Sequence, residues 1–200
     1  MKNNRKRILE SIGIGEELLA EGRQVHGSRI ETVDTGGSFE KTDGMITTRD
    51  SIALAVSTAD CCPVYIYSPP ENALAGLHVG RKGAVKGIIS VSMRKLKSDF
   101  LISPELSVAI MGPAICRECY EINEYIAADF PEDFIEDSDA SCYLDLPGFV
   151  ENLLKKEGIP AGNIFRSEVC TSCSPGLCYS HRRDRGKTGR HWSIAFMREK

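Results

Sequence analysis

The sequence lacks the features that direct a chain into a membrane or out of the cell. No run of apolar residues approaches the length needed to cross a bilayer. Basic residues near the N-terminus (Lys2, Arg5, Lys6, Arg7) are followed by no apolar core, so they do not form a signal peptide. We therefore expect a cytoplasmic protein without membrane contact.

The sequence also lacks internal repeats, low-complexity tracts and any Pro/Gly/Ser linker long enough to separate two domains. Its 200 residues are predicted to form a single domain, 1–200, because a chain of this length can bury a sizeable core. The formal net charge is only −3, which argues against binding to nucleic acid. The oligomeric state is left open by the sequence.

Cysteine, in contrast, is abundant: the chain has eight. In a reducing compartment cysteines more often bind metals or take part in catalysis than form disulfides. This directs the search for a functional site to cysteine and histidine.

Strand-like and helix-like patterns alternate along the chain. Apolar residues at every second position, or short apolar runs, predict strands over 51–57, 63–67, 73–79, 106–112, 191–197 and, more weakly, 163–169. Apolar residues at helical spacing predict helices over 4–12, 83–97, 121–130 and 147–157. The pattern predicts a mixed α/β protein with about four helices.

Within two of these helices the spacing also predicts which side chains are buried. In 83–97 the apolar stripe contains Val85, Ile88, Ile89 and Leu96. In 121–130 it contains Ile122, Tyr125, Ile126 and Phe130, and Pro131 ends the helix.

Three short segments carry metal-binding side chains beside glycine or proline: QVHG at 24–27, ADCCP at 59–63 and LHVG at 77–80. Strand ends and loops are where a rigid sheet presents functional groups. One thiolate and two imidazoles suit Zn²⁺ or copper, and three protein ligands leave a fourth position for water or substrate. The spacing itself matches no compact zinc motif, and the alternative is that these residues belong to the core.

Two questions about this site stay open at the level of the residues. Successive side chains of an extended segment point in opposite directions, so only one of Cys61 and Cys62 faces the site. Asp60 or Gln24 is a candidate for orienting a ligand or transferring a proton, without a basis for choosing between them.

Eight sequence blocks occur in an order that is similar to a known family. They are QVHG at 24–27, DGMIT at 43–47, TADCCP at 58–63, HVGRKG at 78–83, GPAI at 112–115, CYEI at 119–122, CT at 170–171, and SHRRD with TGR at 180–190. On these blocks the chain resembles the YfiH/laccase-domain (multicopper polyphenol oxidase-like) family of zinc purine nucleoside phosphorylases. The resemblance covers roughly residues 4–198.

The resemblance implies that His26, Cys61 and His78 bind one catalytic zinc, which selects Cys61 over Cys62. It implies phosphorolysis of adenosine, inosine, guanosine or methylthioadenosine, together with deamination of adenosine, so the expected partners are a purine nucleoside and phosphate. The implied fold is α+β, with mixed β-sheets sandwiched between helices.

The chain departs from the family pattern in two places. Where the family has HAGWRG, this chain has HVGRKG at 78–83, so that Arg81 replaces an aromatic residue and the substrate preference is open. The sequence also begins near the family's Asn-Arg block, at Asn4-Arg5, and we expect it to lack the N-terminal segment usual in the family.

Basic residues near the predicted zinc site are candidates for binding phosphate. Arg182 and Arg183 can hold phosphate through paired hydrogen bonds, and Arg81 and Lys82 form a second candidate pair beside His78. The alternative for the first pair is a solvated basic segment. Glu121 is either an acid/base group or an ordinary carboxylate in the first turn of a helix.

The remaining cysteines include two C-x-x-C pairs, Cys116/Cys119 and Cys170/Cys173, with Cys178 nearby. This spacing is found in four-cysteine zinc sites and iron–sulfur sites, and the alternative is a set of free thiols. Cys142 is interpreted as structural. Neither His181 nor His191 is expected to be a metal ligand.

Several functions compete at this stage. The first is a zinc purine nucleoside phosphorylase and adenosine deaminase. The second is a copper-dependent polyphenol oxidase, for which a single Cys/His₂ set is small because four-electron oxygen reduction uses several coppers. An enzyme that edits peptidoglycan precursors and a non-enzymatic metal-binding protein are further alternatives.

Overall fold

The computed structural model describes residues 2–138 and 141–198. The described helices are α1 (Lys2–Ile12), α2 (Arg81–Val85), α3 (Ile88–Phe100), α4 (Glu124–Ala127) and α5 (Leu146–Lys156). Among these residues no helix is long and apolar enough to span a membrane.

The strands form three sheets. The largest has the order β12-β8-β6-β7-β4-β2 and is made of β2 (Ile30–Thr32), β4 (Gly44–Thr47), β6 (Cys62–Ser68), β7 (Ala73–Val79), β8 (Val108–Met111) and β12 (Ile164–Arg166). A four-stranded sheet has the order β13-β5-β1-β3 and contains β1 (Leu19–Gly22), β3 (Gly37–Phe39), β5 (Ala53–Thr58) and β13 (His191–Ala195). A small sheet of β9 (Glu121–Ile122), β10 (Ile135–Ser138) and β11 (Ser141–Leu144) has the order β10-β11-β9.

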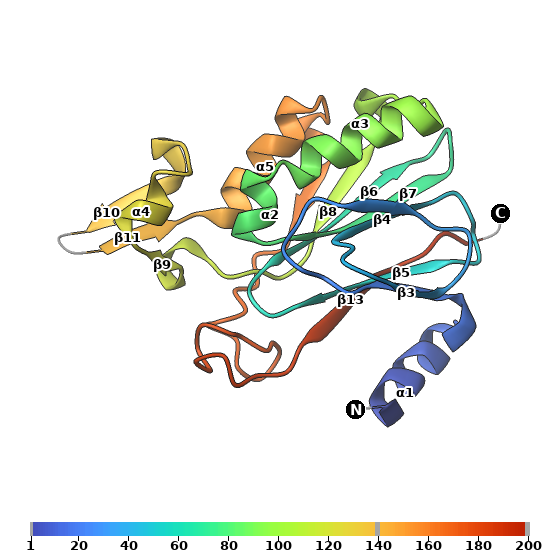
Figure 1. Cartoon of the computed structure of the whole chain (residues 1–200), viewed down its shortest axis with the longest axis horizontal. Coiled ribbons are helices and arrows are strands. Elements are labelled where there is room, and N and C mark those ends of the chain that lie inside the picture. The colour runs from blue at the N-terminus through green and yellow to red at the C-terminus, as the bar shows by residue number, and fades with distance from the viewer. Residues whose placement is uncertain (1, 139–140, 199–200) are drawn as a thin grey trace.

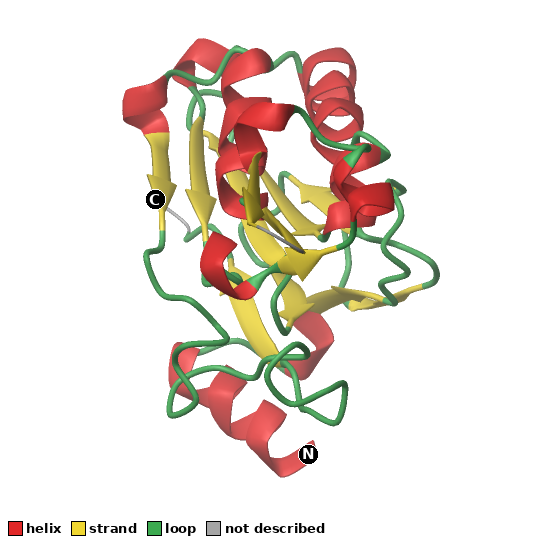
Figure 2. Cartoon of the chain, turned by 90° about the vertical axis from the view of Figure 1, so that its left-hand side faces the viewer, coloured by secondary structure: helices red, strands yellow, loops and turns green. Residues whose placement is uncertain are grey.

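The two larger sheets stack between helices. Figure 1 shows α3 and α5 on one outer side, then the six-stranded sheet, then the four-stranded sheet, and α1 on the other outer side; Figure 2 shows the same layers from another direction. The chain is thus an α+β domain of mixed sheets between helices, as the family resemblance implied.

The alternation of side chains along β5 shows why these layers form. Leu54 and Val56 point into the core between the two sheets, whereas Ala53 and Ala55 face the core beneath α1. The third and largest core lies between the six-stranded sheet and α3 and α5, where Val64 and Leu77 are fully buried. Burial of apolar surface on both faces of the sheets stabilises the stack.

Most of the predicted elements are present, but two predicted helices differ. The helix expected over 83–97 is divided into α2 and α3 because Gly87 adopts a left-handed conformation, with φ of 76°. The prediction that Val85 is buried was wrong, since this side chain lies at the break and is 45% exposed.

The helix expected over 121–130 begins later and is shorter. Ile122 belongs to β9 and pairs with Cys142 of β11. The side chain of Asn123 then caps α4 by accepting a hydrogen bond from the Ile126 N–H. Tyr125, expected on the buried stripe, is 86% exposed. Strand pairing with β11 outweighs the helical spacing of the apolar residues here.

Strand predictions were closer. The range 73–79 coincides with β7, while 106–112 and 163–169 shorten to β8 and β12. The segment predicted as a buried strand over 191–197 forms β13, but its residues are only half-buried because it is an edge strand.

Candidate functional site

A cavity of about 870 Å³ opens at the end of the sandwich, where β5 and β7 end. It is lined by residues from several distant parts of the chain, which include Gln24, His26, Thr58, Asp60, Cys61, His78, Arg81, Lys82, Tyr120, Glu121, Asn123, Ile126, Ser141, His181, Arg182 and Arg190. The three predicted metal ligands therefore share one cavity.

His78 is held by a buried carboxylate. Antiparallel pairing of β4 with β7 places Gly44 opposite Leu77, and the His78 N–H donates to the Asp43 carbonyl at 2.8 Å. Asp43 Oδ1 also lies 2.9 Å from His78 Nδ1. An Nδ1–H that donates to this carboxylate leaves Nε2 of His78 free to bind a metal ion.

The same carboxylate of Asp43 organises the loop that carries His26. It accepts hydrogen bonds from the backbone N–H groups of Val25, His26 and Gly27, the last two at 2.9 and 2.8 Å. His26 has a φ of 58°, a left-handed conformation that costs free energy in a residue other than glycine. The three N–H donors to one buried acceptor offset this cost and direct the imidazole toward His78, so that the two rings lie 4.8 Å apart.

The side chains of the adjacent Cys61 and Cys62 point in different directions at the start of β6. Cys62 is fully buried in the core under α3 and α5, whereas Cys61 lines the cavity. Burial alone raises the pKa of the Cys61 thiol, but hydrogen bonds with His26 and His78 outweigh it and lower the pKa to about 6. Burial raises the pKa of Cys62 to about 12. Cys61 is therefore the thiolate of the pair, which is the form that binds metals.

The protonation states of His78 and Asp43 follow from their contacts. Burial lowers the pKa of His78, but hydrogen bonds to Asp43 and Cys61 raise it to about 9. Burial raises the pKa of Asp43, yet hydrogen bonds from His78, Gly27 and Val25 hold it below its usual range. Binding of a metal ion would release the proton that His78 holds next to Cys61.

One donor atom from each of His26, Cys61 and His78 lies within 4.8 Å of the other two. Gly80 makes this approach possible, because a Cβ atom at this position would lie 2.8 Å from Cys61 Sγ and 3.0 Å from His26 Cδ2. This group could hold a metal ion with a fourth coordination position open toward the cavity.

Asp60 and Gln24, the two open candidates for a supporting role, both have backbone partners. Asp60 accepts hydrogen bonds from the Thr171 hydroxyl and from the Arg182 N–H, each at 2.7 Å. Gln24 exchanges two hydrogen bonds with the backbone of Ser57. Asp60 thus anchors the loop of Arg182, and Gln24 fixes the loop of His26 to β5.

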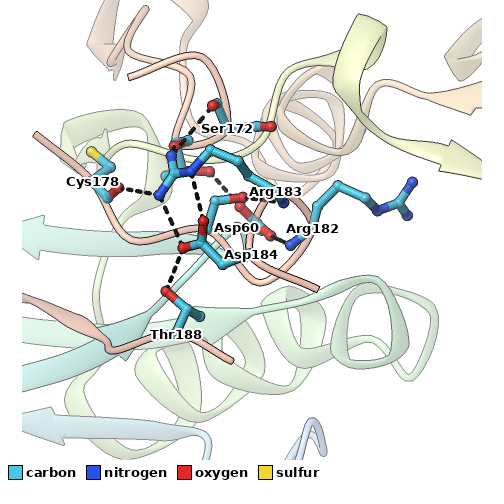
Figure 3. A network of polar contacts seen from close by, with 9 residues as sticks. Asp60, Ser172, Cys178, Arg182, Arg183, Asp184 and Thr188 are labelled. Carbon is cyan, nitrogen blue, oxygen red and sulfur yellow. Dashed lines mark hydrogen bonds and ion pairs between the residues drawn. The ribbon is translucent and has the colours of Figure 1, made fainter. Parts of the chain in front are cut away.

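The four predicted phosphate-binding residues lie in two different settings. Arg81, Lys82 and Arg182 line the cavity, and Arg190 joins them. Arg183 points elsewhere: its guanidinium donates to the carbonyl oxygens of Thr171, Ser172 and Cys178 and pairs with Asp184 (Figure 3). Figure 3 also shows the Arg182 side chain extending away from this network, and its guanidinium donates to the Glu121 carbonyl at 2.6 Å.

Other titratable residues in or near the cavity lie outside the group of His26, Cys61 and His78. His181 lines the cavity, and His191 Nε2 lies 2.9 Å from the Thr58 hydroxyl. Glu121 accepts a hydrogen bond from the Ser141 hydroxyl and belongs to strand β9, not to the first turn of a helix.

The described residues contain a second group whose donor atoms converge. Sγ atoms of Cys116, Cys119, Cys170 and Cys173 all lie within 4.8 Å of one another. Cys178 is outside this group, and its carbonyl accepts from Arg183. Cys142 is buried in the core, as expected for a structural residue.

Asp43 is the functional residue whose role the sequence analysis missed. The DGMIT block was noticed only as part of the family resemblance. An acidic residue directly before the largely apolar segment Gly44–Thr47 is the signal that was available, because a carboxylate next to a buried strand is itself buried and needs donors. Tyr120 and Asn123 of the cavity wall were likewise not predicted.

The family assignment rests on the whole chain. The family model described as multi-copper polyphenol oxidoreductase laccase matches residues 1–198. The chain belongs to this family. Its curated relatives include a purine nucleoside phosphorylase of Deinococcus radiodurans, 32% identical over 195 residues that cover 96% of this chain and 75% of the relative. Another is the purine nucleoside phosphorylase YlmD of Geobacillus stearothermophilus, 31% identical over 98% of this chain and 78% of the relative.

Solved structures of the laccase-domain family share the fold. The crystal structure of YlmD from Geobacillus stearothermophilus superposes with a TM-score of 0.94 at 31% identity, covering 98% of this chain and 80% of YlmD. The structure of the Bacillus licheniformis protein YfiH gives the same TM-score, identity and coverage.

Proposed function

We propose that this chain is a zinc-dependent purine nucleoside phosphorylase that also deaminates adenosine. Its proposed nucleoside substrates are adenosine, inosine, guanosine and methylthioadenosine, with phosphate as the second substrate. The observation that carries the proposal is one cavity that contains both a Cys/His₂ donor group and four basic side chains. Relatives about 30% identical to this chain are named purine nucleoside phosphorylases.

The donor set of the cavity fits zinc. His26, Cys61 and His78 supply the mixed nitrogen and sulfur ligands that zinc prefers, and the hydrogen bond of His78 to Asp43 is the kind of support that metal-bound imidazoles usually have. A zinc ion bound there supplies a Lewis acid that activates water or an oxygen atom of the substrate.

Phosphate binding is assigned to Arg81, Lys82 and Arg182. Arg81 and Lys82 approach the cavity from the first turn of α2 and Arg182 from a loop, so that they can surround an anion near the metal ligands. In phosphorolysis a phosphate oxygen attacks the anomeric carbon of the sugar while the bond to the purine nitrogen breaks. The cations hold the phosphate in place for this attack and reduce its repulsion from the Cys61 thiolate. Arg183 is proposed to act indirectly, by holding the loop over 171–178 in place through hydrogen bonds to its backbone carbonyls.

The purine is proposed to bind along the wall that Tyr120, Asn123 and Ile126 form beside Arg182. Tyr120 offers an aromatic face there, and its hydroxyl stays protonated because burial raises its pKa to about 12. The side chains of Asn123 and Ile126 complete this wall with one polar and one apolar group. The family's aromatic residue is absent at Arg81, so we expect Tyr120 to be the aromatic contact of the base.

A copper oxidase is less well supported by the donor atoms. The chain has four histidines, and only His26 and His78 belong to a converging donor group within the described residues. Reduction of oxygen by four electrons relies on several coppers, whereas the cavity offers ligands for one ion. No feature of the cavity specifically favours peptidoglycan precursors.

The test is incubation of the zinc-loaded protein with inosine, with and without phosphate. We expect release of hypoxanthine that requires phosphate and that His78→Ala abolishes while the circular dichroism spectrum is retained. Release without phosphate would indicate a hydrolase instead. Oxygen uptake with a phenol and copper would indicate an oxidase, and no turnover of any nucleoside would leave a metal-binding protein without enzymatic function.

A further inference from the structure

Two loops far apart in the sequence bring four cysteines together at a place that the proposed reaction does not use. Cys116 and Cys119 follow β8, and Cys170 and Cys173 follow β12. One sulfur atom from each lies within 4.8 Å of the others. Two are still closer, since Cys119 Sγ lies 3.3 Å from Cys173 Sγ.

Strand pairing explains how the loops meet. β8 and β12 are parallel neighbours, with Ile110 opposite Phe165, so that both strands end at the same edge of the sheet. The pairing continues beyond the strands: Ala114 forms an isolated parallel bridge with Cys170, and the Thr171 N–H donates to the Ala114 carbonyl at 3.1 Å. The backbone therefore fixes the two C-x-x-C turns beside each other.

We propose that Cys116, Cys119, Cys170 and Cys173 bind a structural Zn²⁺ ion, distinct from the ion held by His26, Cys61 and His78. Four thiolates fill all tetrahedral positions and leave none for substrate, which is the arrangement of structural rather than catalytic zinc. Binding replaces four thiol protons, which pass to solvent, by one zinc ion.

The separations favour a single ion. With Zn–S bonds of about 2.3 Å, the sulfur atoms of a tetrahedral site are about 3.8 Å apart. The observed upper limit of 4.8 Å is close to this value, and small side-chain rotations bring the four atoms to it. Ligands of an iron–sulfur cluster surround several metal and sulfide atoms and are spread more widely.

Neighbouring groups also suit a cluster of thiolates. The Cys116 N–H donates a hydrogen bond to Cys170 Sγ at 3.3 Å, and such backbone donors support metal-bound sulfur. Arg166 lines a small cavity together with Cys116 and Cys170, although its guanidinium is paired with Asp145 and Glu151. A disulfide between Cys119 and Cys173 would leave the convergence of the other two cysteines unexplained.

The consequence is a link between two walls of the substrate cavity. The first loop continues directly into Tyr120 and Glu121, and the second continues to Arg182. The guanidinium of Arg182 lies 5.3 Å from the Tyr120 ring and donates to the Glu121 carbonyl. A zinc ion at the four cysteines holds these segments in register near the substrate without touching it.

The test counts zinc in protein purified under reducing conditions, loaded with zinc and desalted. We expect two equivalents per chain in the wild type. The double variant Cys116→Ser/Cys173→Ser, with one change in each pair, should retain one equivalent, and His78→Ala should lose the other. Cys142→Ser and Cys178→Ser are matched controls that should retain both, because neither residue belongs to a donor group among the described residues.

Cobalt(II) provides a second measurement that does not depend on activity. A tetrathiolate centre should give strong sulfur-to-cobalt charge-transfer bands, whose intensity scales with the number of thiolates. They should be present in His78→Ala and reduced to the weaker bands of a single thiolate in the double cysteine variant. A wild type with a single equivalent of zinc that is lost in His78→Ala would overturn the proposal. So would iron in place of zinc, or retention of both equivalents in the double variant. Failure of phosphorolysis with both equivalents present would overturn only the proposed function.

Discussion

At the scale of single residues, Cys61 and Cys62 show how strongly position determines chemistry. They are neighbours in the chain, yet one lines the cavity between two imidazoles and the other is fully buried among apolar side chains. The pKa is about 6 for Cys61 and about 12 for Cys62. The thiol of Cys61 should therefore react much faster with electrophiles than the thiol of Cys62.

This difference can be measured by alkylation of protein freed of metal by a chelator. We expect iodoacetamide to modify Cys61 at pH 7, with a rate that falls as the pH drops below about 6, because the thiolate is then protonated. Cys62 should stay unmodified until the protein unfolds. Fragmentation of the peptide by mass spectrometry distinguishes the two positions, and equal labelling would contradict the account. Added zinc should protect Cys61.

Asp43 is the residue that connects both histidines, and its replacement tests that connection. In Asp43→Asn the charge that orients His78 is lost, so we expect zinc affinity at this site to fall roughly 10–100-fold. The zinc concentration that halves the alkylation rate of Cys61 reports this affinity. Asp34→Asn, at an exposed carboxylate paired with Arg49, is the matched control and should leave the value unchanged. Equal affinity in both variants would remove Asp43 from the site.

Arg182 and Arg183 are adjacent and chemically identical, but their surroundings predict opposite effects. Arg182→Ala should raise the KM for phosphate at least about tenfold, because a charge-assisted contact is lost, and should change the melting temperature little. Arg183→Ala should lower the melting temperature, since three backbone carbonyls lose their donor. Steady-state kinetics and thermal unfolding of both variants check this. The reverse assignment would show that Arg183 faces the substrate.

At the scale of elements, Gly87 separates α2, whose first turn carries Arg81 and Lys82, from α3. Gly87 is the N-cap of α3 and has a left-handed backbone conformation. Val85, expected on the buried stripe of a continuous helix, is exposed at this break.

Gly87→Ala should lower the free energy of unfolding by about 1 kcal/mol, because alanine has a Cβ atom that disfavours this conformation. No atom lies within 4 Å of the added Cβ, so the effect isolates the backbone. Gly162→Ala is the matched control: its position also has open space but no left-handed φ, and it should be neutral or slightly stabilising. Denaturant unfolding of the two variants makes the comparison, and equal stabilities would argue against the break.

The elements that sequence analysis predicted well are those whose signal is local. Strand β7 and helix α5 carry long apolar patterns that bury one or both faces, and both were predicted nearly to the residue. Strands β1 to β4 and β9 to β11 are two to four residues long and form only because a neighbour pairs with them. Their existence depends on contacts between distant segments, which periodicity does not describe.

At the scale of the whole molecule, the site also combines features with a local sequence signal and features that depend on contacts between distant segments. Residue types and family blocks were sufficient to predict that His26, Cys61 and His78 converge, because residues with metal-binding side chains are few and chemically distinctive. The carboxylate of Asp43 and the exclusion of Arg183 from the cavity depend on which loops meet at the end of the sandwich. The pairing of β4 with β7 and the anchoring of the 180–184 loop by Asp60 settle these points.

The arrangement of layers gives the cavity its character. Two stacked sheets hold His78 and Cys61 at one end, where segments from both halves of the chain meet (Figure 1). Basic side chains of these segments line the cavity. The proposed metal-assisted reaction of a nucleoside with phosphate needs this combination of fixed donor atoms and nearby cations.

The central claim is that His26, Cys61 and His78 bind one zinc ion in this cavity. The most direct measurement is an anomalous difference map at the zinc edge from crystals of the zinc-loaded protein. The account predicts a peak about 2.3 Å from Cys61 Sγ and about 2.1 Å from one nitrogen of each histidine. A protein that converts inosine with phosphate but shows no peak at these three residues would contradict it.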